Sequence, residues 1–199
     1  MSHRVVELHC IMPIENLPSV LERGILSHDG AEKLAHRSVA KQEIQDRRVG
    51  KTVPNGLRLH QYANLYFCAR NPMLYLRQPE HPNLCVVRIN RTVLSTPNAV
   101  LSDQNAATDY VRFYPYPFGM ERINFDYVFA DWWSDENQIT MWQKKAAKCA
   151  EALIPNVVNP QDIIGFYTCD EQTKQRVETV LRGLQCALPV TTNPHLFFR

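Results

Sequence analysis

The order of its apolar segments is the feature that most constrains the fold of this chain. Runs typical of strands occur at Arg4–Ile11, in LRLHQYANLYFCAR around Leu65, at Leu84–Ile89 and in DIIGFYTCD near the C-terminal end. Helical patterns lie between and after these runs, but strands and helices do not alternate regularly. The order therefore predicts an α+β fold rather than an alternating α/β fold.

Three segments carry helical signals. Glu15–Arg23 places apolar residues on one face before Gly24, and EQTKQRVETVLRGL is amphipathic. The run TMWQKKAAKCAEALIP predicts a helix that Pro155 ends, which would place Glu151 on that helix. The polar stretch from 28 to 54 fits either an amphipathic helix or an ordered loop, and residues 102 to 137 are expected to form long loops and short helices.

Size and composition indicate a chain that folds by itself. It has 199 residues, of which 45% are hydrophobic and 21% charged, so we expect one domain over residues 1–199. The net charge is only +2, so a partner rich in phosphates would need a local basic surface. We find no signal peptide, no run of eighteen apolar residues and no CxxC pair among the six cysteines, and we expect a cytoplasmic protein without membrane contact or metal.

The residues that stand out are few, because the motifs GxSxG, GxGxxG, HExxH and the P-loop are absent. His9 and Glu151 are polar residues in apolar surroundings, and each fits a buried or surface role as well as a catalytic one. The segment RNPMLYLRQPEHPN is both basic and aromatic, which suits unpaired nucleic acid. A buried turn with Tyr75 in the core is the structural alternative.

Taken together, the ordered motifs resemble a known family. His9 is followed by IENLPSVLERGIL, SVAKQEIQDRR at Ser38–Arg48, LHQYANLYFCARNPMLY at Leu59–Tyr75 and KCAEALIP at Lys148–Pro155. In this order and at these spacings they resemble the DarT family of DNA ADP-ribosyltransferase toxins. The resemblance implies a single ADP-ribosyltransferase-like domain with a split β-core that clasps NAD, surrounded by helices.

The resemblance also implies the site. Its catalytic residues would be Arg48 and Glu151, and NAD, the substrate, would contact Leu8, His9, Cys10, Leu26 and Arg48. The implied partners are single-stranded DNA and a cognate antitoxin ADP-ribosyl hydrolase. The modified base would be guanine or thymine, and Lys148-Cys149-Ala150 together with an extra residue after His9 favours guanine slightly. The expected DNA contacts are Arg70, Asn71, Pro72, Met73, Leu74 and Tyr75.

Elementary chemistry agrees with the two catalytic assignments. Cleavage of a glycosidic bond builds positive charge on the sugar, which a carboxylate such as Glu151 stabilises. A guanidinium such as that of Arg48 can hold pyrophosphate oxygens bidentately, although arginine side chains keep their protons and make poor general bases. Two alternatives remain, a transferase that modifies RNA or protein, and an inactive nucleic-acid-binding module that uses Arg70, Tyr75, Arg77 and the aromatic residues of 113–118.

Overall fold

A computed structural model describes residues 4–38 and 41–198. The strands are β1 (Glu7–Pro13), β2 (Ile25–Leu26), β3 (Tyr62–Tyr66), β4 (Leu84–Asn90), β5 (Val100–Ser102), β6 (Phe113–Pro115), β7 (Glu151–Pro155), β8 (Val157–Val158), β9 (Ile163–Thr168) and β10 (Val190–Thr192). The α-helices are α1 (Leu17–Arg23), α2 (His28–Ala31), α3 (Gln42–Val49), α4 (Pro72–Tyr75), α5 (Phe125–Val128), α6 (Gln138–Ala147) and α7 (Glu171–Gly183). Short 3₁₀ helices are η1 (Ile14–Asn16), η2 (Leu59–Gln61), η3 (Gln78–Asn83), η4 (Arg91–Ser95), η5 (Phe118–Glu121) and η6 (Pro160–Asp162).

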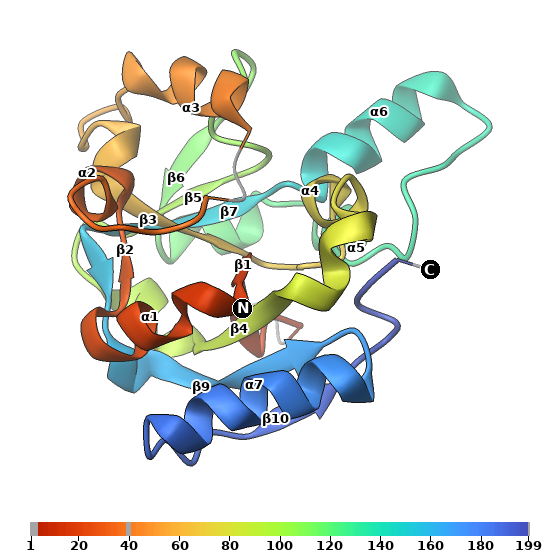
Figure 1. Cartoon of the computed structure of the whole chain (residues 1–199). Helices are drawn as coiled ribbons and strands as arrows, with labels where there is room; N and C mark the ends of the chain where they lie inside the picture. The colour runs from red at the N-terminus through yellow and green to blue at the C-terminus, as the bar shows by residue number, and fades with distance from the viewer. Residues whose placement is uncertain (1–3, 39–40, 199) are drawn as a thin grey trace.

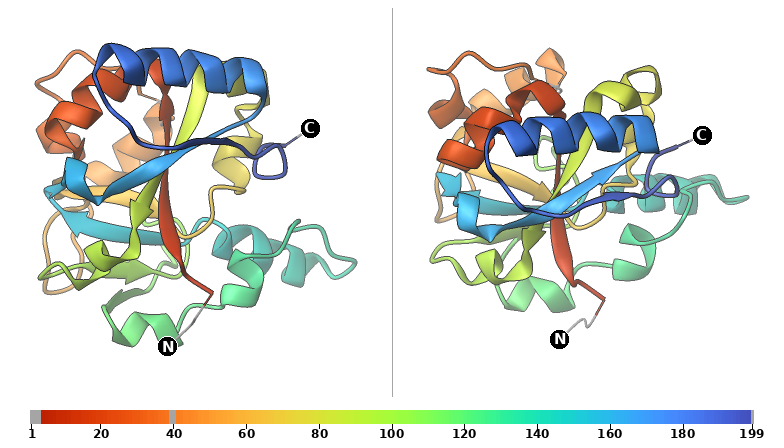
Figure 2. Two further views of the ribbon diagram at one scale, coloured as in Figure 1. Left: turned by 90° about the horizontal axis from the view of Figure 1, so that it is seen from below. Right: turned by 60° about the horizontal axis from the view of Figure 1, so that its bottom comes forward.

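One mixed sheet organises the fold, and the predicted α+β class is confirmed. Within the described residues its strand order is β10-β9-β4-β1-β3-β7-β5-β6, and β2 pairs with β8 in a separate small sheet. The helix α7 lies along β9 and β10 (Figures 1 and 2). Its residues Val177 and Leu181 are buried in the main core. Strands from both ends of the chain therefore meet in one sheet.

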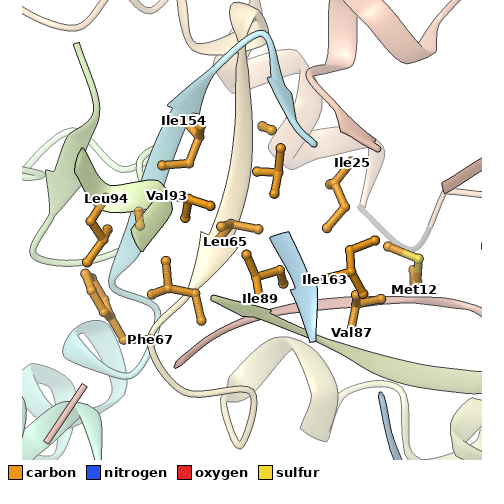
Figure 3. Close-up of a cluster of buried hydrophobic side chains, with 14 of the residues drawn as sticks. Met12, Ile25, Leu65, Phe67, Val87, Ile89, Val93, Leu94, Ile154 and Ile163 are labelled. Atoms are coloured by element: carbon orange, nitrogen blue, oxygen red, sulfur yellow. The ribbon is translucent and has the colours of Figure 1, made fainter. Parts of the chain in front are cut away.

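The main hydrophobic core lies on one face of this sheet. Alternate residues of β1, such as Leu8 and Met12, point to that face and belong to one cluster with Leu65 of β3 and Val87 of β4. Figure 3 shows Met12, Leu65 and Val87 within this cluster. Phe166 of β9 belongs to the same cluster. Burial of these apolar side chains fixes the register, because a slip by one residue would turn each of them to the opposite face.

The opposite face carries a row of polar side chains. The register pairs Arg88 of β4 with His9 of β1, His9 with Tyr66 of β3, and Tyr66 with Glu151 of β7. Directly paired residues share a face, so these side chains follow one line across the sheet. Ser102 of β5 continues the line beyond Glu151.

The sheet opens between β1 and β3. The strand β1 pairs with β4 along its whole length, but it pairs with β3 only at His9 and Tyr66. Beyond this point the two strands diverge, which leaves room between Ile11, Met12 and Pro13 on one side and Tyr62 on the other. A split β-core, as the resemblance implied, is what this pairing produces.

Most expected strands and helices are confirmed, but the helix expected through Glu151 is wrong. The helix α6 ends at Ala147, and Lys148–Ala150 turn the chain into β7, which pairs with both β3 and β5. Sheet pairing on both sides of the apolar run after Glu151 outweighs the helix propensity of its alanines. The polar stretch of 28 to 54 contains α2 and α3, and its residues 39–40 lie outside the described part.

In the region from 102 to 137 the expected loops and short helices are present, together with the short edge strand β6, which was not expected. None of the helices within 4–38 and 41–198 is long and apolar enough to cross a membrane.

Candidate active site

A cavity of about 570 Å³ opens where β1 and β3 diverge. Its walls come from β1, β2, α3, η2, β3 and α4, so the gap in the sheet is closed over by short helices. Arg37, Lys41, Arg48 and Arg77 line it, whereas Glu43 is the only carboxylate among the described lining residues. The walls therefore favour an anionic ligand.

A buried ion pair lies at the inner wall of this cavity. Nη2 of Arg48 donates to both carboxylate oxygens of Glu151, at 2.7 Å to Oε1 and 2.6 Å to Oε2. Arg48 is 4% exposed and Glu151 only 1%, so water screens their attraction weakly. Glu151 begins β7 and Arg48 lies in the last turn of α3, so the sheet and a helix above it bring together residues 103 positions apart.

Neutral donors complete the surroundings of the Glu151 carboxylate. Nδ2 of Asn64 donates to Oε2 at 3.1 Å, and the backbone N–H of Ala106 donates to Oε1 at 3.2 Å. The hydroxyl of Ser102 accepts from the Glu151 backbone N–H at 3.2 Å. These contacts fix both the side chain and the main chain of Glu151.

Arg48 separates Glu151 from the cavity. Arg48, Asn64 and Tyr66 line the cavity, whereas Glu151 does not. Burial raises the pKa of Tyr66 well above its ordinary value, and the nearby Glu151 carboxylate raises it further, so this phenol stays protonated at neutral pH. A ligand in the cavity reaches the carboxylate only if the Arg48 side chain moves aside.

The residues expected to contact NAD lie in two places. Cys10, Leu26 and Arg48 line the cavity. Leu8 is fully buried in the main core, and His9 is 8% exposed beside the point where β1 and β3 part. In this conformation Leu8 supports the wall from behind rather than facing a ligand.

His9 is held by an acidic neighbour. Its Nε2 lies 3.2 Å from Oε1 of Glu7, while Nε and Nη2 of Arg88 bind Oε2 of Glu7 at 2.9 and 2.8 Å. Burial acts to raise the pKa of Glu7, but the hydrogen bonds from His9 and Arg88 outweigh it and lower this pKa to about 2. Because an ionised carboxylate can only accept, Nε2 of His9 is the donor in this contact.

The segment expected to contact DNA is partly a structural element. Asn71 is fully buried and caps α4, where its Oδ1 accepts from the backbone N–H groups of Met73 and Leu74. Leu74 is buried in a core cluster. Within Arg70–Tyr75, the cavity is lined by Pro72 and Met73.

Arg70 and Tyr75 pack toward the C-terminal end of the chain instead. The Arg70 guanidinium donates to the carbonyls of Asp131 at 3.0 Å and His195 at 2.6 Å, and lies 4.2 Å from the ring centre of Phe198. Tyr75, 39% exposed, meets the same Phe198 edge-on. The buried-turn alternative for this segment therefore describes Asn71 and Leu74 well, and Tyr75 only in part.

We expect Arg70→Ala to destabilise the protein by at least about 1 kcal/mol, because it removes charge-assisted hydrogen bonds and cation–π contacts that join two distant segments. Urea unfolding measures this change. Arg23→Ala is the matched control, since Arg23 is exposed and pairs only with the adjacent Glu22 in the described structure. An Arg70→Ala variant as stable as the parent would contradict the structural role.

Sequence reasoning missed several residues of the site. Asn64 had one available signal, its position two residues before Tyr66 on the same strand face. Ser102 and Ala106 had none, because one supplies an acceptor for a backbone N–H and the other a backbone donor. In the part of the chain that the structure describes, no group of three or more His, Cys, Asp or Glu side chains is arranged to hold a metal ion.

Solved structures share this fold. Thermosipho africanus DarTG in complex with ADP-ribose superposes with a TM-score of 0.81 at 28% identity, over 96% of this chain and 51% of that one. Thermus sp. 2.9 DarT in complex with ADP-ribosylated ssDNA gives a TM-score of 0.84 at 21% identity, over 98% of this chain and 97% of that one. The same Thermus protein in complex with NAD⁺ gives 0.79 at 18% identity, over 98% of both chains.

Sequence relatives and a family model agree with these structures. A "DNA ADP-ribosyl transferase-DNA ADP-ribosyl glycohydrolase fusion protein" of Thermosipho africanus is 30% identical over 98% of this chain, which spans about half (50%) of that relative's length. A "DNA ADP-ribosyl transferase" of Thermus sp. is 28% identical over 71% of this chain and 72% of its own length. The model described as "DarT: ssDNA thymidine ADP-ribosyltransferase" matches residues 9–198, and the chain therefore belongs to the DarT family.

Proposed function

We propose that this chain transfers ADP-ribose from NAD⁺ to a base of single-stranded DNA and releases nicotinamide. The observation that carries the proposal is the buried Arg48–Glu151 pair at the inner wall of a cationic cavity, in a chain of the DarT family. An inactive binding module would not need a carboxylate held by four hydrogen bonds beside a cavity whose walls carry mainly cationic side chains. The intact pair therefore supports catalysis over mere binding.

In the proposed reaction the bond between C1′ of the ribose and the nicotinamide nitrogen breaks, and the departing ring takes the bonding electrons. A nitrogen of the DNA base then forms the new bond to C1′ and loses its proton. Positive charge builds on the ribose between these events, and the Glu151 carboxylate stabilises it through the 2′-hydroxyl. The guanidinium of Arg48 supplies the charge that suits the pyrophosphate of NAD⁺.

The proposed NAD⁺ contacts are His9, Cys10, Leu26 and Arg48, with Leu8, whose side chain is buried in the main core, supporting them from behind. Support comes from the cavity position of Cys10, Leu26 and Arg48. For the DNA strand we propose the segment Arg70–Tyr75. Pro72 and Met73 face the cavity, so within this segment they have the most direct access to an acceptor base, while Arg70 holds the segment in place.

We propose thymine as the modified base. The family model is described for thymidine, and the slight preference for guanine that the sequence suggested has no support from the relatives. The two departures beside the site, Lys148–Ala150 and the residues after His9, belong to the turn before β7 and to β1.

The identity of the modified base can be tested with single-stranded oligonucleotides that contain one thymine or one guanine in otherwise identical sequence contexts. After incubation with NAD⁺ we expect mass spectrometry to find an added ADP-ribose on the thymine strands alone. A duplex of the same sequence should react poorly, because a paired base cannot reach the cavity without unstacking. RNA and protein arms test the two other acceptors, and modification of guanine strands alone would overturn the assignment of the base.

The antitoxin partner and the cellular location are also proposals, and the first of them is drawn from the same relatives. The Thermosipho africanus relative combines a transferase with a DNA ADP-ribosyl glycohydrolase, so we propose that a hydrolase of this kind reverses the modification and acts as the cognate antitoxin. We place the reaction in the cytoplasm, where a toxin meets replicating DNA and NAD⁺. We further propose that residues 1–199 act as one domain, supported by a sheet that draws strands from both ends.

A further inference from the structure

The hydrogen bonds around Glu151 leave no room for a substrate hydroxyl. A carboxylate offers about four lone-pair positions on its two oxygens. Arg48 Nη2 and the Ala106 N–H bind Oε1, and Arg48 Nη2 and Asn64 Nδ2 bind Oε2. If the 2′-hydroxyl of the ribose is to bind Glu151, one of these donors must leave.

Arg48 is the donor that can leave. Its long side chain lines the cavity from α3, and a pyrophosphate entering the cavity offers the guanidinium new acceptors. The Ala106 donor is a backbone group, and Asn64 is on β3, whose five residues all pair with β7. The contacts from Ala106 and Asn64 therefore persist when Arg48 turns to the substrate.

Asn64 has a fixed orientation with a free acceptor. Since the ionised carboxylate of Glu151 accepts only, the amide nitrogen of Asn64 must face it, and the amide oxygen must face away. Asn64 lines the cavity, and no donor within residues 4–38 and 41–198 binds its Oδ1. This oxygen is available to a hydroxyl or amide group of a ligand.

We infer that Asn64 is a positioning residue of the transfer reaction. Its amide nitrogen holds Oε2 of Glu151 in place after Arg48 has moved to the substrate, and its amide oxygen remains directed away from the carboxylate. The inference rests on the proposed function. It adds Asn64 to the proposed site as the residue that holds Glu151 while Arg48 binds the substrate.

Two variants separate this role from structural support. Asn64→Ala removes the donor, and nicotinamide release should fall about 10- to 100-fold in kcat, while KM for NAD⁺ changes less than about threefold. Asn64→Asp keeps the shape but, when ionised, has no proton to donate and repels Glu151. At pH 8 this variant should be at least as slow as Asn64→Ala.

The pH dependence of Asn64→Asp carries the decisive readout. Near pH 5.5 we expect the introduced carboxyl group at position 64 to take up a proton beside the Glu151 carboxylate, which restores a donor there and should raise the rate at least about threefold over Asn64→Ala. Among the neighbouring groups, burial raises the pKa of Tyr66 well above its ordinary value and raises those of Cys10 and Cys149 to about 12. His60, on the cavity wall near Arg48, has a lowered pKa, but its titration is common to the parent and all variants.

The experiment measures nicotinamide release between pH 5 and 8, and thermal unfolding, for four proteins: the parent, Asn64→Ala, Asn64→Asp and the control Asn90→Asp. Asn90 caps η4 outside the cavity, and aspartate preserves that cap, so the control should follow the parent. If Asn64→Ala keeps the kcat of the parent, the inference is wrong and the proposed function stands. The same holds if Asn64→Asp shows no gain in rate at low pH. A parent that releases no nicotinamide with any DNA strand overturns the proposed function as well.

Discussion

A Glu151→Gln variant should keep the fold and lose ADP-ribose transfer by at least about 100-fold. Glutamine fills the same space and keeps an oxygen for the Ala106 N–H, but it has no negative charge for the ribose in the transition state. The carboxylate acts mainly on charge that appears during bond cleavage, so kcat should fall much more than the affinity for NAD⁺. In cells, we expect the parent protein to slow growth and the same exchange to restore it.

Single-turnover assays with labelled NAD⁺ measure the transfer rate. Binding titrations measure the affinity for NAD⁺, and thermal unfolding tests whether the fold is kept. Glu22→Gln is the matched control, because Glu22 also pairs with an arginine, Arg23 at 3.4 Å, and neither residue is among the described ones that line the cavity. Its transfer rate should stay near that of the parent. A Glu151→Gln variant that modifies DNA at the parental rate would show that Glu151 is not the catalytic carboxylate.

The sequence predicted the secondary structure best where local pattern and tertiary pairing agree. Leu84–Ile89 is β-branched and apolar, and it forms β4 at the centre of the sheet. KCAEALIP misled because alanine and lysine favour a helix, whereas the residues after Glu151 pair with β3 and with β5, which lie far away in the sequence. Such non-local pairing cannot be seen in the local period of hydrophobic residues.

The residues of the candidate site also fall into those that the sequence predicted and those that it missed. The resemblance pointed to Arg48 and Glu151, and the structure places the guanidinium of one on the carboxylate of the other. Asn64 and the N–H of Ala106 were missed, because their contribution depends on where β3 and the chain after β5 lie relative to β7. Arg70 suggested phosphate binding by its charge, yet its guanidinium binds backbone carbonyls of distant segments.

Arg48 should show the second large effect. Arg48→Ala removes the cation from Glu151 and from the incoming pyrophosphate, so we expect transfer to fall about 100- to 1,000-fold and the affinity for NAD⁺ to weaken. The variant should also be less stable, by less than the roughly 3–5 kcal/mol typical of breaking a fully buried pair, since the space left by the side chain adjoins the cavity and admits water to Glu151.

Arg48→Lys then separates two roles of the arginine. Lysine keeps the charge but lacks the planar fork, so binding of the pyrophosphate should be retained only in part. If Arg48 acts by its charge alone, hydrolysis of NAD⁺ to free ADP-ribose and transfer to DNA should fall by the same factor, because both pass through the same ribosyl cation. If Arg48 also guides the proton that leaves the target base, transfer should fall further than hydrolysis, since water as acceptor does not need that base to be deprotonated. Parallel measurement of free and DNA-bound ADP-ribose gives this ratio directly, and a ratio equal to that of the parent would exclude proton transfer through Arg48.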